Sequence, residues 1–138
     1  MKIIVTRNFN VPAEKVWNVL EDFGNMGWLN MADISIEVIG EDIGMVRRVS
    51  LNGQYIDERL ESMDKQAKLL TYSIDECELF PFKNYLAQMT VEKTTELECK
   101  MTWMSHFEEG DMAKDEAESM MTFNYNTMLD SLAAHVES

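Results

Sequence analysis

The segment that decides the fold is residues 44–60, GMVRRVSLNGQYIDERL, which reads as two strands joined by a tight turn. Asn52 and Gly53 stand between alternating apolar residues, and both tolerate the positive φ angles of a type I′ turn. If they form the turn, one face of the hairpin is apolar apart from a charged pair in its middle. The pairs that face each other on this side are Leu51 with Gln54, Val49 with Ile56, Arg47 with Glu58, and Met45 with Leu60.

The opposed Arg47 and Glu58 fall on the enclosed face of the hairpin, because side chains alternate between the two faces of a strand. A lone buried charge would cost several kcal/mol, whereas an opposed and hydrogen-bonded pair is tolerated. Two interpretations stay open and are compatible: an ion pair that fixes the register of the hairpin, and the polar handle of a ligand pocket. The other face carries residues that suit water, namely Arg48, Ser50, Tyr55, Asp57, Arg59 and Glu61.

Alternating patterns predict further strands on both sides of the hairpin. Pro12 fits the first turn of a helix over 12–23, which Gly24 and Gly27 interrupt before a short irregular or helical piece through Trp28 and Met31. The predicted strands cover residues 2–10, 33–40, 44–51, 54–63, 67–77, 84–94 and 97–107. A long helix over about 112–136 is predicted from an apolar stripe of Ala117, Met121, Tyr125, Met128, Leu132 and Val136.

This order of elements predicts an α+β fold. One long helix with one apolar stripe can cover one face of a curved antiparallel sheet. We therefore expect seven strands wrapped around a long C-terminal helix, with two short helices after the first strand. The 138 residues are enough to bury a sizeable core, and we expect residues 1–138 to form a single domain.

The charge of the chain limits its partners. Lys and Arg number 12 against 25 Asp and Glu, which gives a formal net charge of −13. Nucleic acids and anionic membrane surfaces require a basic footprint, so neither is an expected partner. No apolar run approaches the ~18 residues of a spanning helix, so no membrane insertion is expected. The first residues have no long apolar core, which predicts a cytoplasmic protein. The pattern does not determine an oligomeric state.

Cysteine and histidine are too sparse for a metal centre. Cys77 and Cys99 lie far apart outside any CxxC motif, which favours reduced thiols. His106 and His135 are isolated, and no HExxH motif or Cys/His cluster occurs. Glycine-rich nucleotide motifs are also missing, so we expect no metal and no cofactor.

A series of residues in a specific order spans nearly the whole chain. It comprises Pro12, Val16-Trp17, Asp22-Phe23 and Trp28, then Gly44-x-Val46-Arg47, Gly53, Glu58-Arg59-Leu60-Glu61 and Asp64, then Tyr72-Ser73-Ile74, Pro81, Asn84-Tyr85 and Trp103. This series resembles the START-like superfamily, also called the Bet v 1-like or SRPBCC group. The resemblance is to its bacterial polyketide cyclase/dehydrase-like branch, which is related to the plant abscisic acid receptors. It implies the helix-grip fold with an internal cavity for apolar ligands.

The chain departs from the plant receptors where they contact the hormone. Their Ser-Gly-Leu-Pro-Ala gate is replaced by residues 51–54, LNGQ, and their His-Arg-Leu lid by residues 80–83, FPFK. The lysine that they use for the hormone carboxylate falls near Met31 to Asp33, where no lysine occurs. Hormone sensing by that mechanism is therefore not supported.

Candidate cavity residues are those whose strand or helix position points inward. Tyr72 and Tyr85 stand out because a buried hydroxyl needs a partner, which Arg47 or Glu58 could supply. The chain has 12 methionines, whose flexible thioethers suit either core gaps or an adaptable pocket. The predicted cavity residues are Trp28, Arg47, Val49, Glu58, Tyr72, Tyr85, Met101, Trp103, Met121, Tyr125 and Met128.

Three classes of function remain open. The leading hypothesis is the binding of a small hydrophobic or amphipathic molecule, because the enclosed face is apolar and contains no nucleophile–base set. The alternative is a cyclase or dehydrase in which Glu58 acts as general acid or base and Arg47 or Tyr72 stabilises an oxyanion. The adjacent Arg47, however, favours an ionised Glu58. A third possibility is a protein-interaction or chaperone-associated module.

Overall fold

The computed structural model describes residues 1–74 and 77–138. Strands and helices follow one another almost as the sequence predicts, with boundaries that differ by a few residues. Within the described part of the chain the elements are β1 (Lys2–Phe9), α1 (Ala13–Leu20), β2 (Ile34–Ile39), β3 (Val46–Leu51), β4 (Gln54–Asp64), β5 (Leu69–Cys77), β6 (Lys83–Lys93), β7 (Cys99–Glu108) and α2 (Lys114–Val136).

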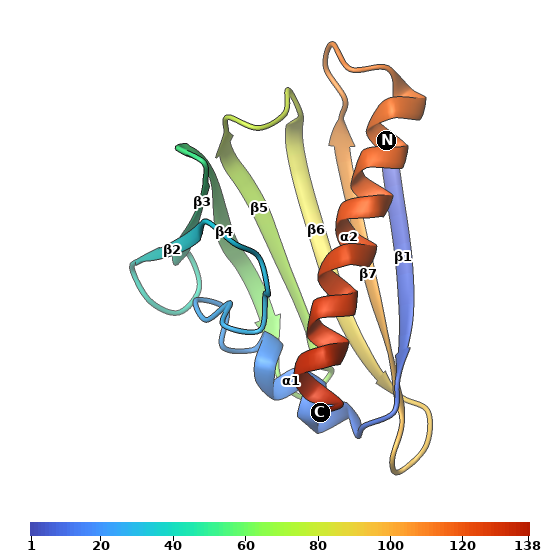
Figure 1. Cartoon of the computed structure of the whole chain (residues 1–138). Coiled ribbons are helices and arrows are strands. Elements are labelled where there is room, and N and C mark those ends of the chain that lie inside the picture. Colours follow the sequence, from blue (N-terminus) through green and yellow to red (C-terminus); the bar gives the residue numbers. More distant parts are fainter.

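The strands form one antiparallel sheet in the order β1-β7-β6-β5-β4-β3-β2. The long helix α2 runs across one face of this sheet, and α1 lies near its C-terminal end (Figure 1). The predicted α+β helix-grip fold is thereby confirmed. Among the described residues, no helix is long and apolar enough to span a bilayer.

The second short helix of the sequence prediction is wrong. Residues 21–33, all of them described, form turns between α1 and β2. Isolated backbone hydrogen bonds run from the Asn25 amide to the Asp22 carbonyl and from the Leu29 amide to the Met26 carbonyl. The Asn25 side chain also accepts a bond from the Gly27 amide, and such local bonds compete with helix formation.

The hairpin of β3 and β4 has the predicted register. Asn52 and Gly53 have φ angles of 51° and 83°, as a type I′ turn requires. Arg47 lies opposite Glu58, Val49 opposite Ile56 and Leu51 opposite Gln54. A slip by one residue would move Arg47 and Glu58 to the outer face, so the turn decides which charges are enclosed.

The sheet is curved. The pairing of β4 with β5 shifts between Asp57 and Glu58 and again between Leu60 and Ser62, and β6 shifts against β7 between Lys83 and Leu86. Such irregularities bend a strand and increase its twist. The concave face thus created is the one that α2 covers.

The buried side of α2 packs into this concave face with the predicted stripe and two additions. Ala117, Met121, Tyr125, Leu132 and Val136 are buried as predicted, and Met128 is half-buried. Leu129 and Ala133 are also buried, because the contact is wider than one i, i+4 stripe.

The outer face of the hairpin is less exposed to solvent at Asp57 than the sequence predicts. Asp57 was expected in water but is only 8% exposed. The Arg48 guanidinium covers it, with Nε at 2.7 Å from Oδ1 and Nη2 at 2.8 Å from Oδ2. Arg48 also stacks on the Tyr55 ring at 4.1 Å. This two-point contact raises the pKa of Arg48 and compensates the buried carboxylate.

Gly110 fixes the start of α2 against the loop of residues 78–82. Its φ angle is 65°, and a Cβ atom there would lie 2.6 Å from the Pro81 carbonyl oxygen. Gly44 also has a positive φ angle, of 93°, but a Cβ atom would meet nothing within 4 Å. Only Gly110 is therefore required by close backbone approach as well as by conformation.

Gly110→Ala should lower the free energy of unfolding by about 1–3 kcal/mol, because it adds a clash to the strain of a positive φ angle. Gly44→Ala carries the strain alone and is the matched control. Denaturant unfolding of both variants measures the difference. Equal losses would show that the contact with Pro81 contributes nothing.

Candidate functional site

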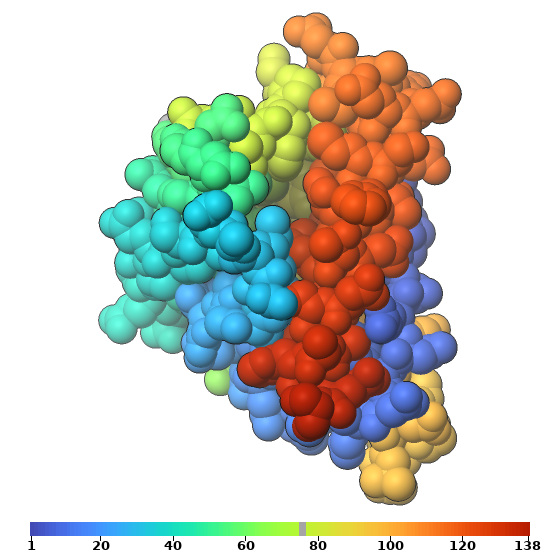
Figure 2. Space-filling model, in the orientation of Figure 1, coloured from blue at the N-terminus to red at the C-terminus, as the bar shows by residue number. Residues whose placement is uncertain are grey.

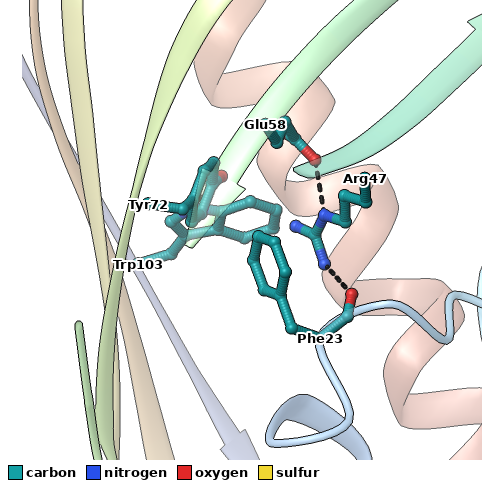
Figure 3. A network of polar contacts seen from close by, with 5 residues as sticks. All are labelled: Phe23, Arg47, Glu58, Tyr72 and Trp103. Carbon is teal, nitrogen blue, oxygen red and sulfur yellow. Dashed lines mark hydrogen bonds and ion pairs between the residues drawn. The ribbon is translucent and has the colours of Figure 1, made fainter. Parts of the chain in front are cut away.

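The Arg47 side chain joins three parts of the molecule. Its Nε donates to Glu58 Oε1 at 2.7 Å, and its Nη1 donates to the Phe23 carbonyl oxygen at 2.9 Å (Figure 3). The guanidinium carbon lies 3.8 Å from the centre of the Phe23 ring and 5.3 Å from that of Tyr72. The predicted direct contact between Arg47 and Glu58 is confirmed.

The buried charge of Arg47 has a counter-charge, a hydrogen-bond acceptor and aromatic rings around it. The Arg47 side chain is 6% exposed and that of Glu58 is 13% exposed. A buried guanidinium is stable only with a counter-charge and hydrogen-bond acceptors, both of which are present. Stacking on aromatic faces adds a cation–π contribution. Arg47 thereby ties the hairpin to the connection between α1 and β2.

A chain of aromatic side chains lies beside the ion pair. Trp103 Nε1 donates to the Tyr72 hydroxyl at 3.2 Å, and the Tyr85 and Tyr125 hydroxyls form a hydrogen bond with each other. Trp103 and Tyr125 stack with ring centres 4.1 Å apart. The sequence pattern had suggested Arg47 or Glu58 as hydroxyl partners, and this expectation is wrong: aromatic neighbours supply the partners.

Burial raises the pKa of these phenols. Desolvation raises the pKa of Tyr72 and of Tyr85 well above the ordinary value, and it also raises the pKa of Tyr125. The Tyr125 phenol and the Glu58 carboxylate add to the rise of the Tyr72 pKa, whereas Arg47 and a hydrogen bond with Tyr85 oppose it. At neutral pH all three hydroxyls therefore carry their protons and can donate hydrogen bonds.

A pocket of about 270 Å³ lies between the concave face of the sheet and α2. In the space-filling view it is the hollow between the helix and the green and cyan segments of the chain (Figure 2). Its walls are mostly aliphatic and thioether groups. The lining residues are Met26, Leu29, Met31, Ile34, Val49, Leu51, Ile56, Glu58, Tyr72, Ile74, Leu79, Phe80, Tyr85, Met120, Met121, Asn124, Tyr125, Thr127 and Met128.

The pocket brings together most of the cavity residues that the sequence pattern indicated. These are Val49, Glu58, Tyr72, Tyr85, Met121, Tyr125 and Met128. Four others are not part of the lining. The Arg47 side chain is buried in its ion pair and does not reach the pocket surface. Met101, Trp28 and Trp103 are buried in the hydrophobic core. Trp103 still supports the wall, because it binds Tyr72 and stacks on Tyr125. Contact of any of these residues with a ligand stays a prediction.

Two walls of the pocket are irregular segments, and the sequence patterns did not indicate most of their lining residues. One is the connection of residues 21–33, which contributes Met26, Leu29 and Met31. Ser131 of α2 holds it: the Ser131 hydroxyl donates to the Trp28 carbonyl at 2.8 Å and accepts from the Asn30 amide at 2.7 Å. The sequence signal for this wall is a set of apolar residues that recur in a connection interrupted by Gly24 and Gly27.

The other irregular wall is the loop of residues 78–82, which contributes Leu79 and Phe80. Phe82 anchors this loop. Its ring lies tilted against Phe80 at 4.6 Å and stacks on Phe107 at 4.2 Å between ring centres. The sequence has a phenylalanine on each side of Pro81, but a loop has no repeating pattern from which the orientation of these side chains could be predicted. The loop closes the pocket at the end where α2 begins.

The polar chemistry of the site is a carboxylate and three phenols facing apolar walls. In the part of the chain that the structure describes, no group of three or more His, Cys, Asp or Glu side chains is placed to hold a metal ion. Cys77 and Cys99 are free thiols, and burial raises the pKa of both. The arrangement can orient a small molecule by hydrogen bonds while its body is buried among apolar groups.

Fold and site together define a helix-grip protein with a ligand-sized apolar pocket. The family model described as "Polyketide cyclase / dehydrase and lipid transport" matches residues 1–137. The chain belongs to this family, which agrees with the START-like resemblance of its sequence. No protein of curated function is similar enough in sequence to be matched.

Solved structures with the same fold come from bacteria and plants. An uncharacterized protein from Bacillus thuringiensis is 23% identical with a TM-score of 0.88, and each chain is covered completely. The protein XoxI from Bacillus cereus is 24% identical, with a TM-score of 0.88 and coverage of 99% of this chain and 96% of that one. Norcoclaurine synthase from Thalictrum flavum, solved with dopamine and hydroxybenzaldehyde, is 16% identical with a TM-score of 0.79, covering 99% and 86%. At these identities the likeness concerns the fold alone.

Arg47→Met should lower the free energy of unfolding by roughly 3–5 kcal/mol, because it leaves the Glu58 carboxylate and the Phe23 carbonyl without a donor. Arg7→Met is the control, since Arg7 pairs with Asp130 at the surface and exposed pairs contribute less than ~1 kcal/mol. Denaturant melts of both variants test this. The double variant Arg47→Met, Glu58→Leu should be more stable than Arg47→Met alone; if it is not, the pair is not what stabilises this region.

Alkaline pH should destabilise the protein. Because the pKa values of Tyr72, Tyr85 and Tyr125 are raised by folding, their contribution to stability is complete below the unfolded value of about 10. It is lost above that pH, where the unfolded chain ionises and the folded chain does not. Phenolate absorbance during an alkaline titration should rise for these three tyrosines only as the chain unfolds. Ordinary titration of all four tyrosines in the folded protein would contradict the buried cluster.

Proposed function

We propose that this protein binds a small hydrophobic or amphipathic molecule in the pocket between the sheet and α2. The observation that carries the proposal is the composition of this pocket, which joins apolar side chains of the sheet and of α2 around one carboxylate. Binding sites for small molecules are concave and mostly apolar, with a few polar groups that fix orientation. Membership of a family described by lipid transport supports the same function.

The methionines of the pocket support binding rather than simple core filling. Met31 is 40% exposed and Met120 is half-buried, so both lie at the mouth, whereas Met121 is buried deeper along α2. Unbranched thioethers adapt their shape to a guest and interact favourably with aromatic rings.

An enzymatic role is the alternative, and one observation favours it. Glu58 and the neutral Tyr72, Tyr85 and Tyr125 hydroxyls line the same pocket, so a base and hydrogen-bond donors could act on one bound carbonyl compound. The family description includes cyclase and dehydrase activity. Turnover that is lost in the double variant Arg47→Met, Glu58→Leu, while this variant stays folded, would support this role.

The binding proposal is tested with the uncharged dye 1-naphthylamine, which is small enough for the pocket and whose fluorescence changes in apolar surroundings. We expect a saturable curve with one site per chain. Ile56→Trp should abolish it by filling the pocket, at a cost of about 1–3 kcal/mol in stability. Ile39→Trp, at a position that is 47% exposed on β2, is the matched control and should bind normally. Absence of saturable binding, or equal binding by both variants, would refute the proposal.

A further inference from the structure

The charge of the pocket is one-sided. Among the lining residues, all of which the structure describes, Glu58 is the only acidic or basic side chain. The remaining polar groups are the hydroxyls of three tyrosines, together with Asn124 and Thr127. A carboxylate accepts hydrogen bonds and donates none. The pocket therefore presents a strong acceptor and no cation.

Arg47 does not supply a cation to the pocket, because it is not among the lining residues and two of its donors are already used within the protein. Nε is taken by Glu58 Oε1 and Nη1 by the Phe23 carbonyl, and the guanidinium is held between the Phe23 and Tyr72 rings. Arg47 is absent from the pocket lining, whereas Glu58 belongs to it. The ion pair is thus oriented with its positive member toward the protein and its negative member toward the pocket.

The second carboxylate oxygen of Glu58 is the open acceptor. Oε1 receives the bond from Arg47, and no described residue donates to Oε2. A bound molecule that placed an N–H or O–H group here would complete the coordination of the carboxylate. A bound carboxylate would instead meet like charge, and the net charge of −13 would add to the repulsion.

We infer that the ligand of this pocket carries a hydrogen-bond-donating head, an alcohol, phenol or amine, which binds Glu58, and that carboxylic acids are excluded. This inference rests on the proposed binding function and narrows its ligand class. Fatty acids and other anionic amphiphiles are thereby removed from the candidates. The apolar body of the ligand lies among the methionine and aliphatic side chains.

The volume of the pocket sets the size of suitable probes. At about 30 Å³ for each water-sized group, 270 Å³ corresponds to on the order of ten non-hydrogen atoms. Naphthol, its methyl ether and naphthoate, all substituted at the same ring position, are of this size. They share one apolar body and differ in the head: a donor, an acceptor without a proton, and an anion.

Calorimetric titration of the full chain at neutral pH with each of the three compounds tests the inference. A hydrogen bond to a charged group has a large effect on affinity, so naphthol should bind roughly ten-fold or more tightly than its methyl ether. Naphthoate should bind more weakly than both. Equal affinities, or tightest binding of naphthoate, would overturn the donor inference while leaving the pocket function intact. Binding of none of the three, together with failure of the dye, would refute the proposed function as well.

A variant experiment places the effect at Glu58. Glu58→Gln leaves the buried Arg47 without its counter-charge and thereby destabilises the chain. The double variant Arg47→Met, Glu58→Leu is therefore used, because it replaces the pair by apolar groups. It should bind naphthol and its methyl ether with affinities within about two-fold of each other. Far-ultraviolet circular dichroism verifies that it is folded. A preserved preference for naphthol in the folded double variant would show that Glu58 is not the acceptor.

Discussion

The contact of Arg47 with Glu58 and with the Phe23 carbonyl is the constraint on which the architecture of the pocket depends. It joins the hairpin of β3 and β4 to the connection between α1 and β2, which is not part of the strand ladder of the hairpin. Burying a guanidinium requires acceptors in fixed places, so the contact defines both the register of the hairpin and the position of the connection. The wall formed by Met26, Leu29 and Met31 is then held at one end by Arg47 and at the other by Ser131.

The same pair gives the pocket its polarity. A salt bridge between two charges of equal depth would present a neutral surface to a guest. Here Arg47 is more deeply enclosed than Glu58, and only the carboxylate belongs to the lining. Behind it, the phenols of Tyr85 and Tyr125 satisfy each other, which leaves the site few groups that must be desolvated when a ligand enters. Binding energy can therefore come mainly from the apolar walls.

The regular parts of the structure followed from the sequence, and the irregular parts did not. Alternation and the Asn52-Gly53 turn give the strands and the register of Arg47 against Glu58, because both rest on local geometry. The second short helix was wrong since side-chain and turn bonds around Asn25 replaced helical ones. Burial of Asp57 and the partners of the tyrosine hydroxyls depend on neighbours across the sheet, which a single-strand pattern does not specify. The directions of Phe80 and Leu79 likewise follow from tertiary contacts of their loop.

The curved sheet keeps its shape through main-chain hydrogen bonds, which are indifferent to most side chains that project from it. The pocket walls, by contrast, are side chains that project from the sheet, from α2 and from two loops, with methionine at five of the lining positions. Frame and lining can therefore change independently over evolutionary time, so that a substitution at a lining position alters what fits inside without altering how the backbone closes. For an engineer, the lining of this protein is an exchangeable part: a new guest can be accommodated by replacing thioethers, provided that the Arg47 anchor is left in place.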